Sequence, residues 1–226
     1  MSDYFSKDAS KSYDERNRKL APIADGMHFL IRLALKELPP RARILCVGVG
    51  TGAEILSLAE AYPDWTFVGV DPAEGMLDVC RERLAKAGHA ARVELIHGYV
   101  QDAPAGENFD AALSILVGHF VKRTERADFY GQMTKRLRPG GVLVNTEISF
   151  DLDSPEVSSM LPNWMRVQEM MGATPESLAQ VPRLLREALT VLPPAETEKF
   201  IKESGIPVPV RFFQAFMISG WYGQKS

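Results

Sequence analysis

Short apolar runs and longer helical repeats alternate along most of the chain. The runs have the length of β-strands, whereas the segments between them carry apolar residues at every third or fourth position. The expected strands are residues 44–47, 65–70, 92–96, 109–115 and 142–148, and the expected helices are residues 24–38, 53–59, 72–84 and 124–137. Strands that alternate with helices predict an α/β fold built on a parallel sheet.

The last third of the chain breaks this alternation. The segment 149–193 is too long for a plain crossover and carries many Met and Leu residues, so we expect a helical insert. Three interpretations of this insert stay open: a lid over an apolar substrate, a dimer surface, or a part of the core. Residues 194–204 are then expected to form a helix, and residues 208–216 and 218–223 a closing antiparallel hairpin.

The stretch from residue 44 to residue 59 predicts a strand, a glycine turn and a helix. Gly48 and Gly50 permit tight turning and close approach of the backbone to a ligand, which the N-terminus of the helix would face. Asp71 ends the next strand, 19 positions after Gly52 (71 − 52), where a ribose-binding acid is expected. Glycine turns also occur in α/β proteins without a cofactor, and Asp71 before Pro72 also fits a helix start.

Three blocks of sequence, residues 44–52, 68–77 and 137–143, together resemble the class I S-adenosylmethionine-dependent methyltransferases. The resemblance covers residues 40–150 well and the flanks loosely. It implies a Rossmann-like, seven-stranded, mostly parallel sheet with an antiparallel terminal hairpin, which binds S-adenosyl-L-methionine at the carboxyl ends of its strands and yields S-adenosyl-L-homocysteine as product. The chain departs from the family at Cys46 and Tyr99, where an acidic residue is usual.

The resemblance also implies the contacts of the cofactor. Gly48, Gly50 and the adjoining amides are expected to hold its amino-acid end and Asp71 its ribose, while Tyr99 and Val100 recognise its adenine. Asp102 is either an acceptor for the exocyclic amine of adenine or a partner of local backbone in an ordinary turn. The full set of expected cofactor residues is Tyr13, Val47, Gly48, Val49, Gly50, Asp71, Pro72, Met76, Tyr99, Val100, Ser114, Ile115 and Leu116.

The loop Leu116–His119 is expected to face the methyl acceptor. His119 is a candidate general base, because an unperturbed imidazole has a pKa near ~6.5. A lone histidine without a visible carboxylate partner also fits a structural or cofactor-contact role. We expect the acceptor to be a small, partly apolar molecule that enters between the N-terminal arm, this loop and residues 164–171 of the insert.

The N-terminal arm carries several aromatic residues in a polar context. Tyr13 lies in a segment that resembles the part of these methyltransferases that folds over bound cofactor, so Tyr4, Phe5 and Tyr13 are candidates to line the pocket. The alternative is a helix that docks on an edge of the sheet, with the aromatic residues filling the seam.

Length and composition predict one domain. With 226 residues and 46% hydrophobic composition, the chain can bury one substantial core and is short for two. We divide residues 1–226 into an N-terminal helical arm (1–40), a cofactor-binding core (41–150), a helical insert (151–193), and a final helix and hairpin (194–226).

Charge and residue usage narrow the classes of partner. A net charge of −3 without a block of basic residues argues against nucleic acid. The cysteines Cys46 and Cys80 fall within apolar patterns, and no metal-ligand spacing links them to the four histidines. The polar start lacks a signal-peptide core, and no apolar stretch approaches the ~20 residues that span a bilayer. A cytoplasmic protein is therefore expected, with no membrane partner and with a homodimer as one interpretation of the insert.

The end of the chain also shows partial resemblance to the bacterial carboxy-S-adenosylmethionine synthases, which make a cofactor used in tRNA modification. Phe200 falls where those enzymes have the arginine that holds the extra carboxylate. The expected function is an S-adenosylmethionine-dependent methyltransferase. The alternatives are an enzyme similar to carboxy-S-adenosylmethionine synthase and a non-catalytic protein that binds S-adenosylmethionine.

Overall fold

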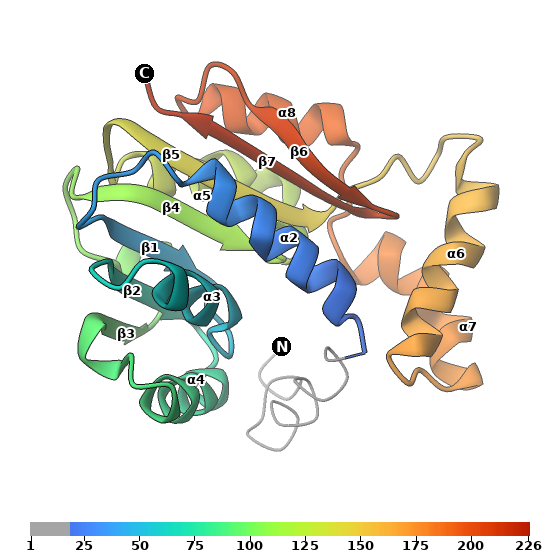
Figure 1. Ribbon diagram of the computed structural model, residues 1–226. Helices are drawn as coiled ribbons and strands as arrows, with labels where there is room; N and C mark the ends of the chain where they lie inside the picture. The colour runs from blue at the N-terminus through green and yellow to red at the C-terminus, as the bar shows by residue number, and fades with distance from the viewer. Residues whose placement is uncertain (1–18) are drawn as a thin grey trace.

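One mixed β-sheet organises the protein, and helices cover both of its faces (Figure 1). The computed structural model describes residues 19–226, so Tyr4, Phe5 and Tyr13 lie outside the described residues. The strands are β1 (Arg43–Val47), β2 (Thr66–Asp71), β3 (Val93–His97), β4 (Phe109–Ile115), β5 (Leu137–Ile148), β6 (Val210–Ala215) and β7 (Ile218–Gln224).

The seven strands lie in the order β3-β2-β1-β4-β5-β7-β6. Strands β1 to β5 pair in parallel, whereas β7 runs antiparallel to both β5 and β6. The strand order reverses direction between β1 and β4. In open α/β sheets the loops at the carboxyl ends of such neighbours bound the ligand crevice. The predicted fold, a mostly parallel sheet with a terminal hairpin, is confirmed.

Helices cover the two faces of the sheet in two groups. The helices are α2 (Ala21–Ala34), α3 (Ala53–Ala61), α4 (Glu74–Lys86), α5 (Arg126–Thr134), α6 (Val157–Met170), α7 (Pro175–Arg183) and α8 (Pro194–Glu203). Helices α2, α3 and α4 bury apolar side chains in one cluster, and α5 and α8 in a second cluster on the opposite face. In Figure 1, α2 and α3 lie in front of the sheet and α5 and α8 behind it.

Strand β1 shows why its sequence is a continuous apolar run rather than an alternating one. Ile44 and Cys46 belong to the first cluster, whereas Leu45 and Val47 belong to the second. Successive side chains of a strand point to opposite faces, and both faces of a parallel sheet are covered by helices. Every residue from Ile44 to Val47 is therefore buried.

The insert forms a third apolar cluster beyond the carboxyl ends of the parallel strands (Figure 1). Its helices α6 and α7, together with the π-helical turn Leu184–Ala188, bury Trp164, Val167, Val181 and Leu185. Met217 and Ile218 of the β6–β7 hairpin belong to the same cluster. Part of the apolar surface of the insert is therefore used to dock the insert on the hairpin.

The boundary between α5 and β5 differs from the expectation. The apolar repeat predicted a helix as far as Leu137, but α5 ends at Thr134 and β5 begins at Leu137. Leu137 pairs with Phe109 of β4, and Lys225 donates a hydrogen bond from Nζ to its carbonyl oxygen at 2.8 Å. Partners distant in the sequence thus override a local helical pattern. Within residues 19–226, we find no helix long and apolar enough to span a membrane.

Candidate cofactor and acceptor site

The glycine turn after β1 has the backbone that only glycine adopts readily. Gly48 and Gly50 have positive φ angles of 68° and 52°. A Cβ at Gly48 would lie 2.5 Å from Cγ2 of Val117, whereas a Cβ at Gly50 would have no atom within 4 Å. The amides of Gly48 and Val49 both donate to the carbonyl oxygen of Val70, at 2.8 and 3.1 Å. The turn is therefore hydrogen-bonded to β2 and packed against the loop after β4, and it faces open space at Gly50.

Asp71 holds the end of β2 against this turn. One carboxylate oxygen accepts a hydrogen bond from the amide of Gly50 and the other from the amide of Ala73, each at 2.8 Å. The side chain is buried, and burial raises the pKa of its carboxyl group, although these two N–H donors lower it. Each carboxylate oxygen has a second lone pair. Asp71 can therefore accept further hydrogen bonds from a ligand while it keeps the turn in place.

The turn after β3 joins the same region. The amide of Gly98 donates to the carbonyl oxygen of Asp71 at 3.0 Å. Tyr99 is exposed and Val100 is buried, and the amide of Tyr99 donates to Oδ2 of Asp102 at 2.7 Å. Asp102 thus bonds local backbone, one of the two alternatives that the sequence left open.

The loop after β4 crosses the glycine turn. Leu116 has a φ angle of 59°, which is rare for a residue with a side chain, and its amide donates to the carbonyl oxygen of Thr146 at 2.7 Å. Its side chain contacts both the cluster beneath α2 and α3 and the cluster of the insert. This loop therefore lies where the core and the insert meet.

The other predicted cofactor residues that the structure describes lie in or beside these turns. Val47 ends β1 and is paired with Ser114, which is fully buried in β4. The set contains the buried residues Val47, Val49, Met76, Val100 and Ser114, the half-buried residues Ile115 and Leu116, and the exposed Pro72. The structure therefore brings the described members of the set to the carboxyl ends of β1, β2, β3 and β4.

Comparison with known proteins adds three observations. Residues 44–141 match a family model described as a methyltransferase domain. The carboxy-S-adenosyl-L-methionine synthase of Methylococcus capsulatus is 26% identical over 219 residues, which cover 96% of this chain and 90% of the relative. A ubiquinone/menaquinone biosynthesis C-methyltransferase of Syntrophotalea carbinolica is 33% identical over 138 residues, or 61% of this chain and 56% of the relative. Residues 44–141 therefore carry a methyltransferase domain of the S-adenosylmethionine-dependent type.

Solved structures of other methyltransferases share the fold. The geranyl diphosphate C-methyltransferase of Streptomyces coelicolor, in complex with Mg²⁺, geranyl diphosphate and S-adenosyl-L-homocysteine, superposes with a TM-score of 0.67. The two sequences are 11% identical, and the match covers 92% of this chain and 82% of the other. At this identity the likeness shows the fold alone.

The site of this methyltransferase fits S-adenosylmethionine. The open space at Gly50 leaves room for a ligand, and the buried carboxylate of Asp71 next to it can accept hydrogen bonds from ribose hydroxyls. The resemblance expected an acid where Cys46 stands, but a different buried carboxyl group lies near Cys46. It belongs to Glu54, in the first turn of α3.

Glu54 is a member of this region that sequence reasoning missed. Burial, together with a smaller effect of the nearby charge of Asp71, raises the pKa of its carboxyl group to about 8, although a backbone hydrogen bond and the charge of Arg83 lower it. Burial also raises the pKa of the Cys46 thiol, and that of the Cys80 thiol to about 12, so both cysteines stay protonated at neutral pH. A single Glu within the apolar pattern of residues 53–59 was the only signal for it in the sequence.

His119 is buried under the loop after β4. Its Nδ1 accepts a hydrogen bond from the amide of Ile148 at 3.3 Å, which leaves the proton of the neutral imidazole on Nε2. Burial lowers the pKa of His119 to about 3, with a contribution from the charge of Arg126. This geometry favours the structural role among the two alternatives, and the role of His119 as a general base stays a prediction.

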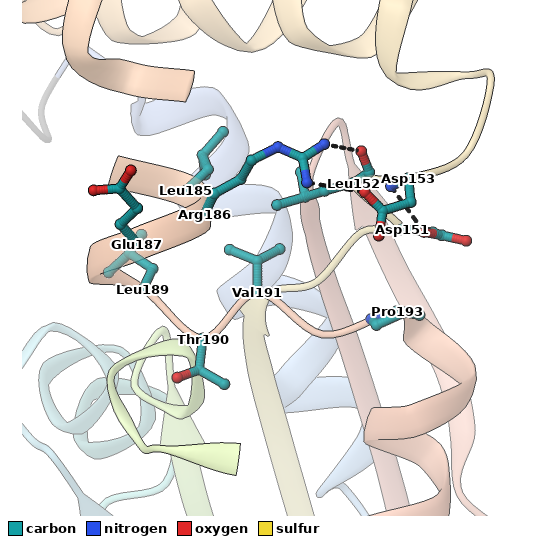
Figure 2. Close-up of a pocket in the computed structure, with 10 residues that line it drawn as sticks. All are labelled: Asp151, Leu152, Asp153, Leu185, Arg186, Glu187, Leu189, Thr190, Val191 and Pro193. Carbon is teal, nitrogen blue, oxygen red and sulfur yellow. Dashed lines mark hydrogen bonds and ion pairs between the residues drawn. The ribbon is translucent and has the colours of Figure 1, made fainter. Parts of the chain in front are cut away.

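A cavity of about 440 Å³ opens at the base of the insert (Figure 2). Arg186 reaches across it and donates hydrogen bonds to Oδ1 of Asp153 and to the carbonyl oxygen of Leu152, at 2.9 and 2.5 Å. Thr190 lines the cavity, and its amide donates to the carbonyl oxygen of His119 at 2.8 Å. The cavity therefore lies beside the loop after β4 and is lined by residues of the insert and its ends.

Among residues 19–226, no group of three or more His, Cys, Asp and Glu side chains is arranged to hold a metal ion.

Proposed function

We propose that this methyltransferase transfers the methyl group of S-adenosylmethionine to a small, partly apolar molecule. The observation that carries the proposal is the position of Leu116, which contacts both the core beneath the glycine turn and the apolar cluster of the insert. An acceptor between this loop and residues 164–171 would lie next to the cofactor and against apolar side chains. Methionine side chains in that part of the insert adapt to ligands of irregular shape.

The proposal assigns the cofactor to the turns at the carboxyl ends of the strands. Gly50 leaves space for its amino-acid end, Asp71 accepts hydrogen bonds from its ribose, and Val100 packs on its adenine. The remaining assigned contacts are Tyr13, Val47, Gly48, Val49, Pro72, Met76, Tyr99, Ser114, Ile115 and Leu116. The buried Asp71 carboxylate and the glycine backbone support this assignment.

The main task of the protein in this reaction is to align the acceptor with the methyl group of the cofactor. The bound cofactor supplies an electrophilic methyl group on a sulfonium. The protein has to hold an acceptor atom in line with that group and keep water away. The apolar insert and the buried loop after β4 suit that task. His119 is a neutral hydrogen-bonding residue in this scheme.

Calorimetry with S-adenosylhomocysteine and with NAD tests the cofactor assignment, and binding of NAD alone would contradict it.

Turnover is tested with a demethylated menaquinol analogue, because a quinone methyltransferase is among the relatives. Formation of S-adenosylhomocysteine that depends on this acceptor supports the proposal. The matched pair Met165→Ala and Met160→Ala then tests the insert. Both side chains pack against the insert cluster, but only Met165 lies within residues 164–171. Met165→Ala should therefore raise KM for the acceptor, whereas Met160→Ala should not.

A second candidate is a reaction like that of carboxy-S-adenosylmethionine synthase. The similarity over 96% of the chain favours it, and the aromatic Phe200, which packs against the second cluster instead of offering a cation, disfavours it. Mass spectrometry of the small molecules that co-purify with the protein separates the two. S-adenosylmethionine or S-adenosylhomocysteine favours methyl transfer, and a carboxylated analogue favours the synthase and its link to tRNA modification.

The proposal includes a cytoplasmic, single-domain protein with the four parts expected from the sequence. Both cysteines are buried and free, which suits a reducing compartment.

The proposal also includes a homodimer that forms through the insert, and the exposed side chains of Met170 and Leu184 support it. Light scattering on the wild type and on Met170→Glu/Leu184→Glu tests the dimer, and a monomeric wild type would contradict it.

A further inference from the structure

A buried ion pair lies under the loop after β4. Nη1 of Arg126 donates to Oε2 of Glu147 at 2.7 Å, and both side chains are fully shielded from solvent. Tyr130 donates its hydroxyl proton to the same oxygen at 3.0 Å, and Thr197 donates to Oε1 at 2.7 Å. The carboxylate therefore has a partner on each oxygen, drawn from α5 and α8. Sequence reasoning gave no indication of this cluster.

Arg126 also donates hydrogen bonds to two further segments. Its Nε donates to the carbonyl oxygen of Val121, at the end of the loop after β4, at 3.0 Å. Its Nη2 donates to the carbonyl oxygen of Thr190, at the end of the insert, at 2.9 Å. Thr190 in turn donates its amide proton to the carbonyl oxygen of His119 in that loop. One guanidinium group thus connects the loop, strand β5 and the end of the insert.

The loop lies directly on the ion pair. A Cβ built at Gly118 would lie 1.7 Å from Oε2 of Glu147 and 3.1 Å from Nη1 of Arg126. Glycine is needed here because of this close approach. Two residues earlier, Leu116 has its unusual φ angle of 59°. Residues keep such angles only where their surroundings hold them firmly.

Global stability alone does not explain a buried pair of this kind. Desolvation of two charges offsets much of their attraction, and well-packed apolar residues of similar volume often stabilise a protein as well or better. The particular property of this pair is its set of partners. A planar guanidinium with several donors in a fixed fork can join three carbonyl or carboxylate groups at once, which an apolar pair cannot do.

We propose that Arg126 is a positioning residue for methyl transfer. Together with Glu147 it holds the loop Leu116–Val121 and the end of the insert at Thr190 as one unit, and that unit forms one wall of the acceptor pocket. The inference rests on the proposed function for the location of the acceptor. Whether Arg126 fixes the loop and the end of the insert does not depend on the acceptor, and it is measured separately.

The decisive variant is the double change Arg126→Met/Glu147→Leu, which removes the donors and both charges while it keeps an apolar core. Hydrogen–deuterium exchange should rise at least about tenfold in residues 116–121 and 189–193, with residues 43–71 unchanged. Affinity for S-adenosylhomocysteine should fall by no more than about threefold, because Leu116 is the one assigned cofactor contact in the loosened loop and the pair forms no hydrogen bond with the glycine turn or Asp71. The proposal would be overturned if the folded double variant exchanged hydrogen for deuterium in residues 116–121 as slowly as the wild type does. It would also be overturned if the exchange rate rose evenly over the whole chain.

Two further variants keep the test sharp. The exposed pair Arg183 and Glu187 has the same residue types at the same distance of 2.7 Å, so Arg183→Met/Glu187→Leu is the matched control and should leave the exchange of residues 116–121 unchanged. If the buried double variant does not fold, Arg126→Lys replaces it. The retained positive charge in Arg126→Lys should allow the protein to fold. Its single ammonium group should protect residues 116–121 and 189–193 from hydrogen–deuterium exchange only in part, and exchange as slow as in the wild type would contradict the proposal.

The NMR signal of the Arg126 Nε–H provides a spectroscopic check. It should be visible and slow to exchange in the wild type and lost in Arg126→Lys. With the menaquinol analogue as acceptor, Arg126→Lys should raise KM for the acceptor more than KM for the cofactor. If the wild type binds no S-adenosylhomocysteine, the proposed function fails, whereas the exchange data still decide whether Arg126 holds the two segments.

Discussion

The carboxylate of Asp71 accepts a hydrogen bond from the amide of Gly50 at 2.8 Å and so joins the end of β2 to the glycine turn after β1. The two residues are 21 positions apart in the sequence. Because the same carboxylate also accepts from the amide of Ala73, its orientation is set before any ligand arrives. This arrangement suits a side chain that has to present its remaining lone pairs to ribose hydroxyls.

Asp71→Asn should weaken binding of S-adenosylhomocysteine by at least about tenfold, because hydrogen bonds to a charged group contribute about 1.5–3 kcal/mol each. The amide nitrogen would also face one of the two backbone N–H donors that the carboxylate oxygens now accept from. Calorimetry on the folded variant measures the effect. Asp64→Asn, in the exposed turn before β2, is the control. Equal affinities for the wild type and Asp71→Asn would limit Asp71 to a structural role.

Gly48→Ala should destabilise the protein more than Gly88→Ala does. Both glycines have positive φ angles, 68° and 76°, which cost a residue with a side chain about 1–2 kcal/mol. A Cβ at Gly88 would meet no atom within 4 Å, whereas one at Gly48 would lie 2.5 Å from Val117 and should cost about 1–3 kcal/mol more. Urea denaturation measures both. Similar losses in the free energy of unfolding for the two variants would show that the loop after β4 moves aside at little cost.

Glu54 should make stability fall as pH rises. Burial raises the pKa of its carboxyl group in the folded state to about 8, from 4.5. The folded state therefore binds a proton that the unfolded state has lost between pH 4.5 and 8, and stability decreases by up to about 1.4 kcal/mol per pH unit in that window. Glu54→Gln should raise the melting temperature at pH 8 but hardly at pH 4.5. Glu60→Gln, at an exposed position of α3, should have no such pH dependence.

His119 should make stability fall in acid. Its pKa is lowered by burial to about 3, from 6.5, so the unfolded state binds a proton that the folded state does not between those values. Stability is therefore fully present above pH 6.5 and decreases progressively as the pH falls toward 3. His119→Gln should show a shallower loss of melting temperature between pH 7 and 4.5, and a change at exposed His97 is the comparison. Equal slopes for the wild type and His119→Gln would contradict the buried neutral imidazole.

The sequence by itself determined the features that depend on neighbouring residues. The continuous apolar runs identified the parallel strands β1, β2, β4 and β5, since both faces of each of these strands had to be buried. The spacing of Gly48 and Gly50 located the turn, because a positive φ angle is a local property of the backbone. Asp71 was recognised from its distance along the chain, which a strand, a turn and a helix of ordinary length make nearly constant.

Only the tertiary structure decided features whose partners come from separate segments. Arg126 and Glu147 are 21 positions apart, and the same guanidinium reaches Thr190, 64 positions away, so no local pattern could pair them. Glu54 reads as an ordinary helical glutamate until the elements packed around it bury its carboxyl group and raise its pKa. Leu137 fits a helical repeat and a strand equally well, and pairing with Phe109 decides between them. In each case the deciding free energy comes from burial and from contacts that exist only after the sheet and its helices have assembled.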